Sequence, residues 1–295
     1  MVTRPPTFAA VVITLDEELH IRECLERLTW CDERIVVDMA SEDRTREEAV
    51  GLATKVLLHE RTPNFDAARN VGINAATSDW IIAIDADELV PESLARRLQA
   101  IVADAGDVAG IRIPRMNYCF GRPLPHVGGF PDYQLRCFRR DAGRYTPTLH
   151  AAPTVQGAVH FLPADDGVWI QHVRKNASVG DLVRKWDAYA ETEARDRSRA
   201  GHRFSGPIAA LWIAASAFRA RFFTMHGYRD GMPGLVLSVM FAFYRFEVEA
   251  KLWEPVRDDH GWDAAVRRLR SIPHLGAALA AHGLRRLWKR KAGGA

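Results

Sequence analysis

The chain has 295 residues, 47% of them hydrophobic and 26% charged, which is the ordinary composition of a globular protein with a substantial core. Its formal net charge of +3 is too small to indicate nucleic-acid binding, and no nucleic-acid partner is expected. The four cysteines show no CxxC spacing, which is typical of reduced thiols rather than of a zinc site or a disulfide framework. The first residues, MVTRPPTF, lack the apolar core of a signal peptide, so we expect a cytoplasmic protein.

The first part of the chain alternates strand-like and helix-like segments. Strands are expected at residues 8–14, 34–38, 55–58 and 80–85, and helices at 16–30, 44–53, 66–76 and 91–102. Asp16 is placed to cap the first helix, and Pro91 stands at the start of the fourth. Because the strands are continuous apolar runs, the pattern predicts an α/β fold: a Rossmann-like, mostly parallel sheet sandwiched by helices.

The pattern changes after the fourth helix. Residues 110–172 consist of short segments punctuated by glycine and proline, which predict an antiparallel or mixed extension of the sheet. A charged amphipathic helix is expected over 178–200. Two uncharged, aromatic-rich runs follow at 205–218 and 231–244, each shorter than the about 20 residues that span a bilayer.

The C-terminal part has two interpretations. Arginines border the two aromatic-rich runs, and the tail segment RRLWKRK (285–291) carries five cations around one tryptophan. These features favour an amphipathic helical surface that lies in a membrane interface. The alternative is a buried helical hairpin that packs on the rest of the chain or on a second copy, which leaves a homo-oligomer open. We expect two domains, residues 1–175 and 176–295.

The fourth strand ends in a group of like charges. Residues 79–90 read DWIIAIDADELV, so Asp85, Asp87 and Glu88 follow directly on an apolar run. Carboxylates this close disfavour one another's charge unless cations or donors offset them, and Mg²⁺ is one such cation. In parallel sheets, ligands bind beyond the carboxyl ends of the strands. The residues expected to meet in that crevice are Thr14, Asp16, Asp38, Asp85 and Asp87.

Two stretches carry a resemblance to a known family. FAAVVITLDEELHIRECLERLTWCDERIVVDMASEDRT and NFDAARNVGINAATSDWIIAIDADELV resemble family 2 glycosyltransferases of the GT-A fold, and more closely their lipopolysaccharide-core glucosyltransferase-like branch. The resemblance is good over residues 8–100, weaker through 253 and absent in the tail. It implies an inverting, metal-dependent enzyme that moves a hexose from a nucleotide sugar, such as UDP-glucose, to a lipid-linked saccharide. With the aromatic-rich runs and the basic tail, a lipid-linked acceptor favours a peripheral position on the inner face of the cytoplasmic membrane.

The resemblance implies roles for particular residues. The donor would be bound by Thr14, Asp16, Glu18, Asp38, Arg69, Asp85 and Ala86, and the metal, Mg²⁺ or Mn²⁺, by Asp87, Asp85 and His172. Asp38 would contact the uracil or the ribose, and Arg69 the donor, since a guanidinium matches a phosphate. Arg136 and His150 would meet the phosphates or the acceptor. Asp132, in a loop rich in glycine and proline, is the expected general base.

Each assignment has a simpler alternative. Asp38 and Asp43 would cap the second helix, Arg69 would be an exposed helix residue, Asp132 would cap a loop, and His172 would be structural. Asp85 and Asp87 would be solvated turn residues, and Arg136 would lie on an exposed strand face. The sequence also departs from the branch, because Asp16 stands where an asparagine is usual and Ala151 where a glutamate follows the histidine.

Two other function classes remain as alternatives. A non-catalytic nucleotide-sugar-binding scaffold at the membrane has the missing glutamate at Ala151 as its only support. A nucleotidyltransferase would share the sheet and the acids, but it would carry a glycine-rich phosphate loop after the first strand. The segment ITLDEELH is not such a loop.

Overall fold

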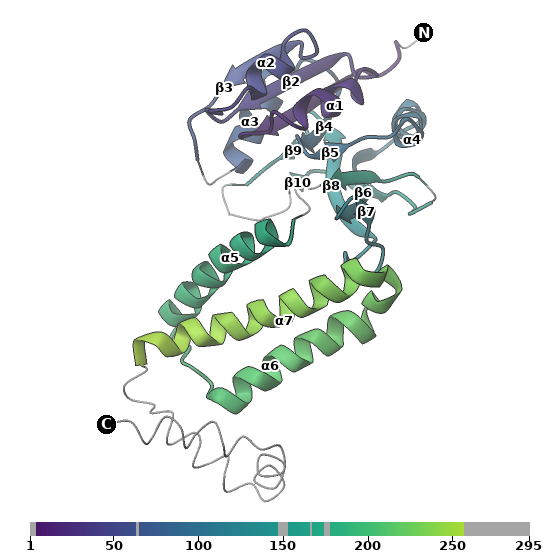
Figure 1. Cartoon of the computed structure of the whole chain (residues 1–295). Coiled ribbons are helices and arrows are strands. Elements are labelled where there is room, and N and C mark those ends of the chain that lie inside the picture. The colour runs from purple at the N-terminus through teal and green to yellow at the C-terminus, as the bar shows by residue number, and fades with distance from the viewer. Residues whose placement is uncertain (1–3, 63–64, 147–152, 166, 174–177, 257–295) are drawn as a thin grey trace, which may run out of the picture. The chain divides into compact units, whose positions relative to one another are not determined.

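The structure, a computed structural model, describes residues 4–62, 65–146, 153–165, 167–173 and 178–256 (Figure 1). The chain divides into two compact units. The sheet unit comprises Met1–Ser178 and Met225–Gly234, and the helical unit comprises Val179–Thr224 and Leu235–Ala295. The predictions for His150, Ala151 and the tail 285–291 concern residues outside the described ranges.

The described part of the sheet unit contains one ten-stranded sheet. Its strands are β1 (Phe8–Thr14), β2 (Glu33–Asp38), β3 (Lys55–Leu58), β4 (Trp80–Asp85), β5 (Glu88–Leu89), β6 (Val108–Cys119), β7 (Arg122–Pro123), β8 (Asp132–Arg139), β11 (Ala158–Phe161) and β12 (Ile170–Val173). Their order is β3-β2-β1-β4-β8-β6-β12-β5, with β7 and β11 also paired to β6. β9 (Gly143–Arg144) and β10 (Thr154–Val155) form a separate antiparallel pair.

Strand directions divide the sheet into a parallel part and a mixed part. β1 to β4 pair in parallel, and β8 runs antiparallel between β4 and β6. All seven residues of β1 are buried, as expected for a central strand covered on both faces. The predicted α/β fold, with its parallel half and mixed extension, is therefore confirmed.

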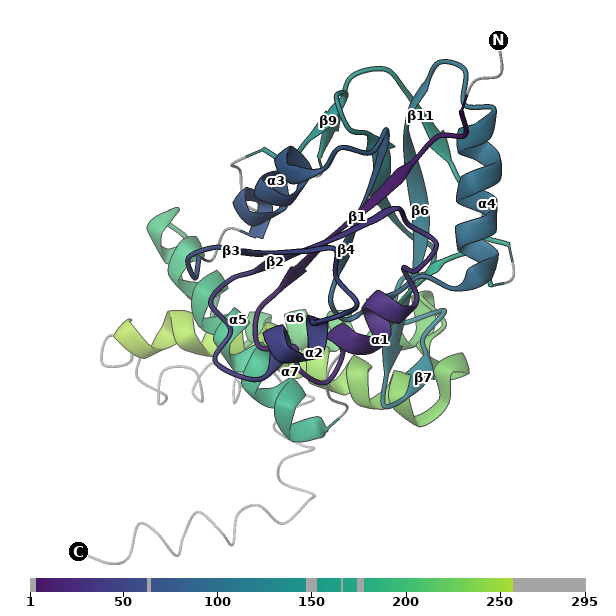
Figure 2. The same ribbon diagram turned by 90° about the horizontal axis from the view of Figure 1, so that it is seen from above.

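Helices cover both faces of this sheet (Figure 2). They are α1 (Ile21–Glu26), α2 (Thr45–Ala49), α3 (Phe65–Ala75) and α4 (Glu92–Ala103). Side chains of α1, α2 and α4 share one core cluster with Phe8, Ala10 and Val12, whereas α3 packs with Ala9 and Val11 on the other face. The glycine at position 72 permits this close packing, because a Cβ there would lie 2.4 Å from Val11 Cγ1.

The first helix differs from its prediction. It covers only Ile21–Glu26 instead of residues 16–30, and its N-cap residue is His20. The expectation that Asp16 caps it is wrong, since Asp16 has φ +55° and its carboxylate accepts hydrogen bonds elsewhere. The amides of residues 16–18 donate to side chains of Ser41, Thr45 and Asp43, so the chain after β1 forms a loop before it forms a helix.

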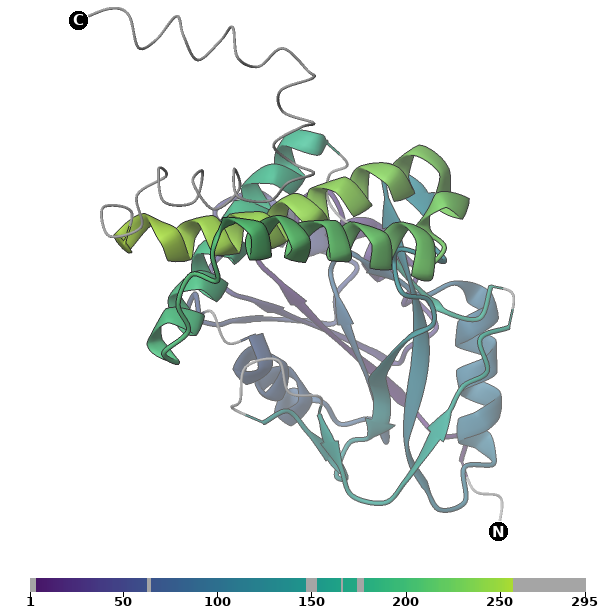
Figure 3. The same cartoon turned by 90° about the horizontal axis from the view of Figure 1, so that it is seen from below.

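The helical unit contains α5 (Val179–Arg199), α6 (Pro207–Arg219) and most of α7 (Gly231–Trp253). A π-helical turn, Ala220–Thr224, follows α6, and 3₁₀ turns at Gly227–Asp230 and Glu254–Val256 flank α7. Trp186 of α5 meets Phe241 and Tyr244 of α7 edge to face. Figure 3, like Figure 1, shows α6 and α7 running side by side.

The second aromatic-rich run belongs to a longer helix than expected. It forms the first part of the 23-residue helix α7, and with its flanking turns the helical segment extends over Gly227–Val256. By length and composition alone this segment is able to cross a membrane, and 22% of its most apolar window is buried. That is weak support for a span, since a core helix of a soluble protein passes the same test. The uncharged run ends at residue 244, and the helix continues beyond it because charged residues such as Arg245 and Glu249 do not end a helix.

Candidate active site

The strand register brings the predicted acids to one edge of the sheet. Thr14 pairs with Asp38 across β1 and β2, and Ile13 pairs with Asp85 across β1 and β4. Thr14, Asp38 and Asp85 are the last residues of their strands. Parallel strands end at a common edge, so side chains far apart in sequence meet there.

Thr14 and Asp38 present polar atoms that lack partners. Asp38 is fully buried, and its Oδ2 accepts a hydrogen bond from Ser41 N at 3.2 Å. Its Oδ1 and the hydroxyl of Thr14 are buried without a hydrogen-bond partner among the described residues. Buried polar atoms normally have partners, so two unsatisfied atoms on neighbouring strands mark a place where a ligand is able to satisfy them. Asp38 does not cap α2, because its bond goes to Ser41 instead.

The acids after β1 join two loops. Asp16 Oδ1 accepts from Glu42 N at 2.8 Å, and Glu18 Oε2 accepts from Arg44 N at 3.1 Å. In return, Asp43 Oδ2 accepts from Glu18 N at 3.0 Å. These bonds tie the loop after β1 to the loop after β2. Asp43 also accepts from Thr45 N, the first residue of α2, which agrees with its alternative role as a cap.

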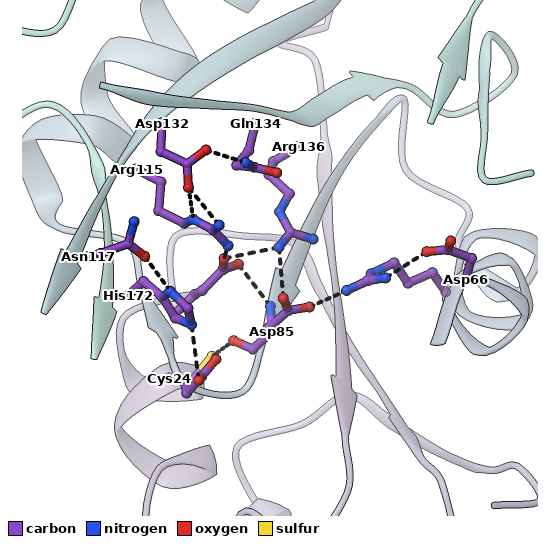
Figure 4. Close-up of polar contacts among 12 residues, drawn as sticks. Cys24, Asp66, Asp85, Arg115, Asn117, Asp132, Gln134, Arg136 and His172 are labelled. Atoms are coloured by element: carbon purple, nitrogen blue, oxygen red, sulfur yellow. Dashed lines mark hydrogen bonds and ion pairs between the residues drawn. The ribbon is translucent and has the colours of Figure 1, made fainter. Parts of the chain in front are cut away.

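Asp85 lies between two arginines (Figure 4). Arg69 Nη2 donates to Asp85 Oδ1 at 2.5 Å, and Arg136 Nη2 donates to Oδ2 at 2.7 Å. Burial raises the pKa of Asp85, but Arg136 and Arg69 outweigh it and hold that pKa well below its usual range. Asp85 is therefore an anion already neutralised by protein cations.

The two arginines are themselves buried. The Arg69 side chain is 12% exposed and Arg136 7%, so neither is the exposed surface residue that the alternatives describe. Arg69 also donates to Asp66 at 2.7 Å and lies over the ring of Tyr145. Their hydrogen bonds go to carboxylates, so in this structure both arginines position Asp85.

His172 and Asp87 form a second group. Asn117 Nδ2 donates to the carbonyl of Gly128 at 3.0 Å, which turns Asn117 Oδ1 toward His172 Nδ1 at 2.7 Å. An amide oxygen only accepts, so Nδ1 carries the proton and the Nε2 of a neutral ring carries a lone pair. This Nε2 faces Asp87 Oδ2 at 3.2 Å. Two acceptors this close need a cation between them, either a proton or a metal ion.

This pair fits a divalent metal. Metal-ligating histidines commonly donate their other ring N–H to an oxygen, as His172 does to Asn117. Octahedral bonds of about 2.1 Å place neighbouring ligand atoms about 3 Å apart, which is close to the Asp87–His172 spacing. Asp85 points to the arginines instead, and within the described ranges no three His, Cys, Asp or Glu residues gather as a metal site. Within the described ranges, Asp87 and His172 are the pair whose spacing fits such an ion.

Asp132 lies at the other end of the polar cluster. It is the first residue of β8, directly opposite Arg115 of β6. Arg115 Nη2 donates to Asp132 Oδ2 at 2.7 Å, and Gln134 Nε2 donates to Oδ1 at 2.7 Å. Burial raises the pKa of Asp132, but the charge and hydrogen bonds of Arg115, with hydrogen bonds from Gln134 and Asn117, hold it below its usual value. The side chain is 28% exposed, so a bound hydroxyl is able to reach it.

Four residues of this cluster were not predicted from the sequence: Glu88, Arg115, Asn117 and Gln134. Glu88 is fully buried, and it accepts from Arg115, Arg136 and the amide of Asp85. A signal existed for two of them. Glu88 follows the paired aspartates directly, and Arg115 is a charge within the apolar strand IRIPRM. Ala86, predicted beside the donor, is buried in the core cluster of α1.

A family model and a curated relative match this chain. The model of glycosyl transferase family 2 matches residues 9–157. The lipopolysaccharide core biosynthesis glycosyltransferase LpsC of Rhizobium meliloti is 24% identical over 259 residues, covering 83% of this chain and 92% of that protein.

Solved structures of glycosyltransferases show lower similarity. The mannosyltransferase PcManGT of Pyrobaculum calidifontis is 16% identical with a TM-score of 0.45, covering 97% of this chain and 84% of that one. Glucosyl-3-phosphoglycerate synthase of Mycobacterium tuberculosis is 19% identical with a TM-score of 0.36, and it covers 46% of this chain. The match spans 57% of the synthase, little more than half its length.

The family model matches half of the chain. The matched residues include nearly all of β1 to β4, with Thr14, Asp38 and Asp85 at strand ends and Asp87 just after β4. The predicted family and the predicted GT-A fold are therefore confirmed. The chain belongs to glycosyl transferase family 2 and is a glycosyltransferase.

Proposed function

We propose that the chain transfers a hexose from a nucleotide sugar to a lipid-linked saccharide, with inversion at the sugar carbon. The donor is UDP-glucose or a similar nucleotide hexose, and the acceptor is a lipopolysaccharide core or a related envelope glycan. The name of the relative LpsC supports the acceptor class. The single observation that carries the reaction is the Asp87–His172 pair at the same sheet edge as the unsatisfied Thr14 and Asp38.

Each group then has a distinct role. Thr14 and Asp38 bind the nucleoside, with Asp16, Glu18 and Ala86 in the surrounding loops. Asp87 and His172 hold Mg²⁺ or Mn²⁺, which when bound neutralises charge on the leaving diphosphate. Arg69 and Arg136 keep Asp85 charged and oriented toward this edge. His150 remains an expected acceptor or phosphate contact.

The reaction needs one base. The acceptor hydroxyl oxygen bonds to C1 of the donor sugar while the bond from C1 to the diphosphate oxygen breaks. The electron pair of that bond leaves with the nucleoside diphosphate, and the hydroxyl proton passes to the Asp132 carboxylate. Because the nucleophile enters opposite the leaving group, the configuration at C1 is inverted. Residues 1–175 supply all these groups.

We assign residues 176–295 to a peripheral position on the cytoplasmic membrane surface. The support is an exposed apolar face on α6, where Leu211 is 62% and Trp212 73% exposed. No acidic residue occurs from 204 to 229, whereas Arg219, Arg221 and Arg229 do. Exposed apolar side chains next to arginines are typical of a helix that lies in the interface of a bilayer with anionic headgroups. Flotation with anionic vesicles tests this: Trp212→Ser should weaken binding, and the equally exposed Leu19→Ser should not.

A donor panel tests the reaction. Purified protein is incubated with UDP-, dTDP- or GDP-sugars, Mn²⁺ or Mg²⁺, and a lipid-linked saccharide, and released nucleoside diphosphate is measured. We expect turnover with one donor, loss of turnover in Asp87→Ala, and no change in Glu92→Ala, which alters an exposed acid of α4. Absence of turnover with every donor and acceptor, together with metal-dependent UDP binding, would instead identify a non-catalytic binding protein.

A further inference from the structure

A chain of alternating charges links the end of β4 to the proposed base (Figure 4). In spatial order its members are Arg69, Asp85, Arg136, Glu88, Arg115 and Asp132. Arg69 also pairs with Asp66, so the connected ion pairs hold three cations and four anions. Only its last member, Asp132, takes part in the proposed proton transfer.

Arg115 joins Asp132 to the buried part of this array. Its Nε and Nη2 both donate to Asp132 Oδ2, at 3.0 and 2.7 Å, while Nη1 donates to Glu88 Oε1 at 2.9 Å. Glu88 is fully buried, and the Arg115 side chain is only 16% exposed. The guanidinium is thus held by Glu88 at one edge and donates from its other edge to Asp132. This geometry fixes the orientation of the Asp132 carboxylate and also places a positive charge beside it.

We propose that Arg115 is the positioning residue of the base: it fixes the Asp132 carboxylate in one orientation and holds it as an anion. This inference rests on the function proposed for Asp132. Arg115 has no role of its own in the proposed bond formation, because its hydrogen bonds go to Asp132 and Glu88.

The surroundings of Asp132 show why Arg115 is needed. From β6, Arg115 and Asn117 face the carboxylate, and Gln134 faces it from its own strand. Among these neighbours only Arg115 is a cation, and the anion Glu88 lies behind it. Burial raises the pKa of Asp132, and the Arg115 guanidinium is the first of the groups that lower it, ahead of Gln134 and Asn117. Without Arg115, burial and Glu88 would both favour the protonated carboxyl, which is unable to accept a proton.

The test is the pH dependence of kcat/KM for the acceptor, measured in the full chain with the donor that gives turnover. A base acts only when unprotonated, so the rate falls as pH drops through its pKa. Arg115→Gln removes the cation, so the acid limb should move to higher pH. Arg115→Lys keeps the charge but loses the fork, so its acid limb should stay near that of wild type while kcat falls roughly 10- to 100-fold.

Arg112→Gln is the matched control. Arg112 lies three residues earlier on the same strand, is also half-buried, and contacts the ring of Phe161 rather than the cluster. An Arg115→Gln acid limb that coincides with those of wild type and Arg112→Gln would overturn the inference. If Arg115→Gln fails to fold, Arg115→Lys decides, since full kcat in that variant would equally overturn it. Asp132→Asn separates the two proposals: turnover in that variant refutes the base itself, whatever Arg115 does.

Discussion

Glu88 offers the sharpest test of the charge array as a structural element. Its carboxylate is fully buried and accepts three hydrogen bonds, from Arg115, Arg136 and the Asp85 amide. Removing one partner of a buried ion pair costs about 3–5 kcal/mol when the other charge is left uncompensated, and the low end applies here because Arg115 and Arg136 keep Asp132 and Asp85 as partners. Glutamine keeps an acceptor oxygen, so we expect Glu88→Gln to lower the free energy of unfolding by about 3 kcal/mol.

Thermal unfolding followed by circular dichroism measures this loss. For a domain of this size, about 3 kcal/mol corresponds to a decrease in Tm of roughly 6–12 °C. The control is Glu92→Gln, which changes an exposed carboxylate of α4 and should stay within about 0.5 kcal/mol of wild type. A Glu88→Gln variant as stable as this control would mean that Arg115 and Arg136 do not depend on Glu88 for compensation.

Three further changes probe the other parts of the site and the sheet. Asn117→Leu removes the acceptor for His172 Nδ1, so Mn²⁺ affinity measured by calorimetry in the presence of UDP should fall about 10- to 100-fold; an unchanged affinity would argue against His172 as a ligand. Asp38→Asn should weaken UDP binding about 10-fold or more, because a charged acceptor is lost; equal dissociation constants would place the nucleoside elsewhere. Gly72→Ala should lower the free energy of unfolding by roughly 1–3 kcal/mol, since the new methyl group overlaps Val11, and an unchanged Tm would show that α3 shifts freely.

Much of the parallel half could be predicted from the sequence. The strands at 8–14, 55–58 and 80–85 have the predicted bounds, because a strand buried on both faces is a continuous apolar run. The meeting of Thr14, Asp38 and Asp85 followed from the rule for parallel strand ends. That rule requires only strand direction and not register.

The partners of these acids could not be predicted, because they depend on register in the mixed half. A register shift occurs between Ile111 and Arg112, where β6 pairs with β8. Ile111 pairs with Cys137, so an unbroken ladder would have placed Arg115 opposite Tyr133. The register shift instead places Arg115 opposite Asp132, so that both side chains lie on the same face of the sheet. No local pattern in IRIPRMNY indicates this one-residue change.

The same contacts explain how three carboxylates stand together after β4. Asp85 is neutralised by Arg69 and Arg136, and Glu88 shares Arg136 with it and also binds Arg115. These cations come from the protein, so neither carboxylate needs a metal ion to remain charged. Asp87 differs, because its contact there is an imidazole nitrogen whose lone pair faces it when the ring is neutral. The arginines therefore compensate two of the three carboxylates, Asp85 and Glu88, whereas Asp87 contacts His172.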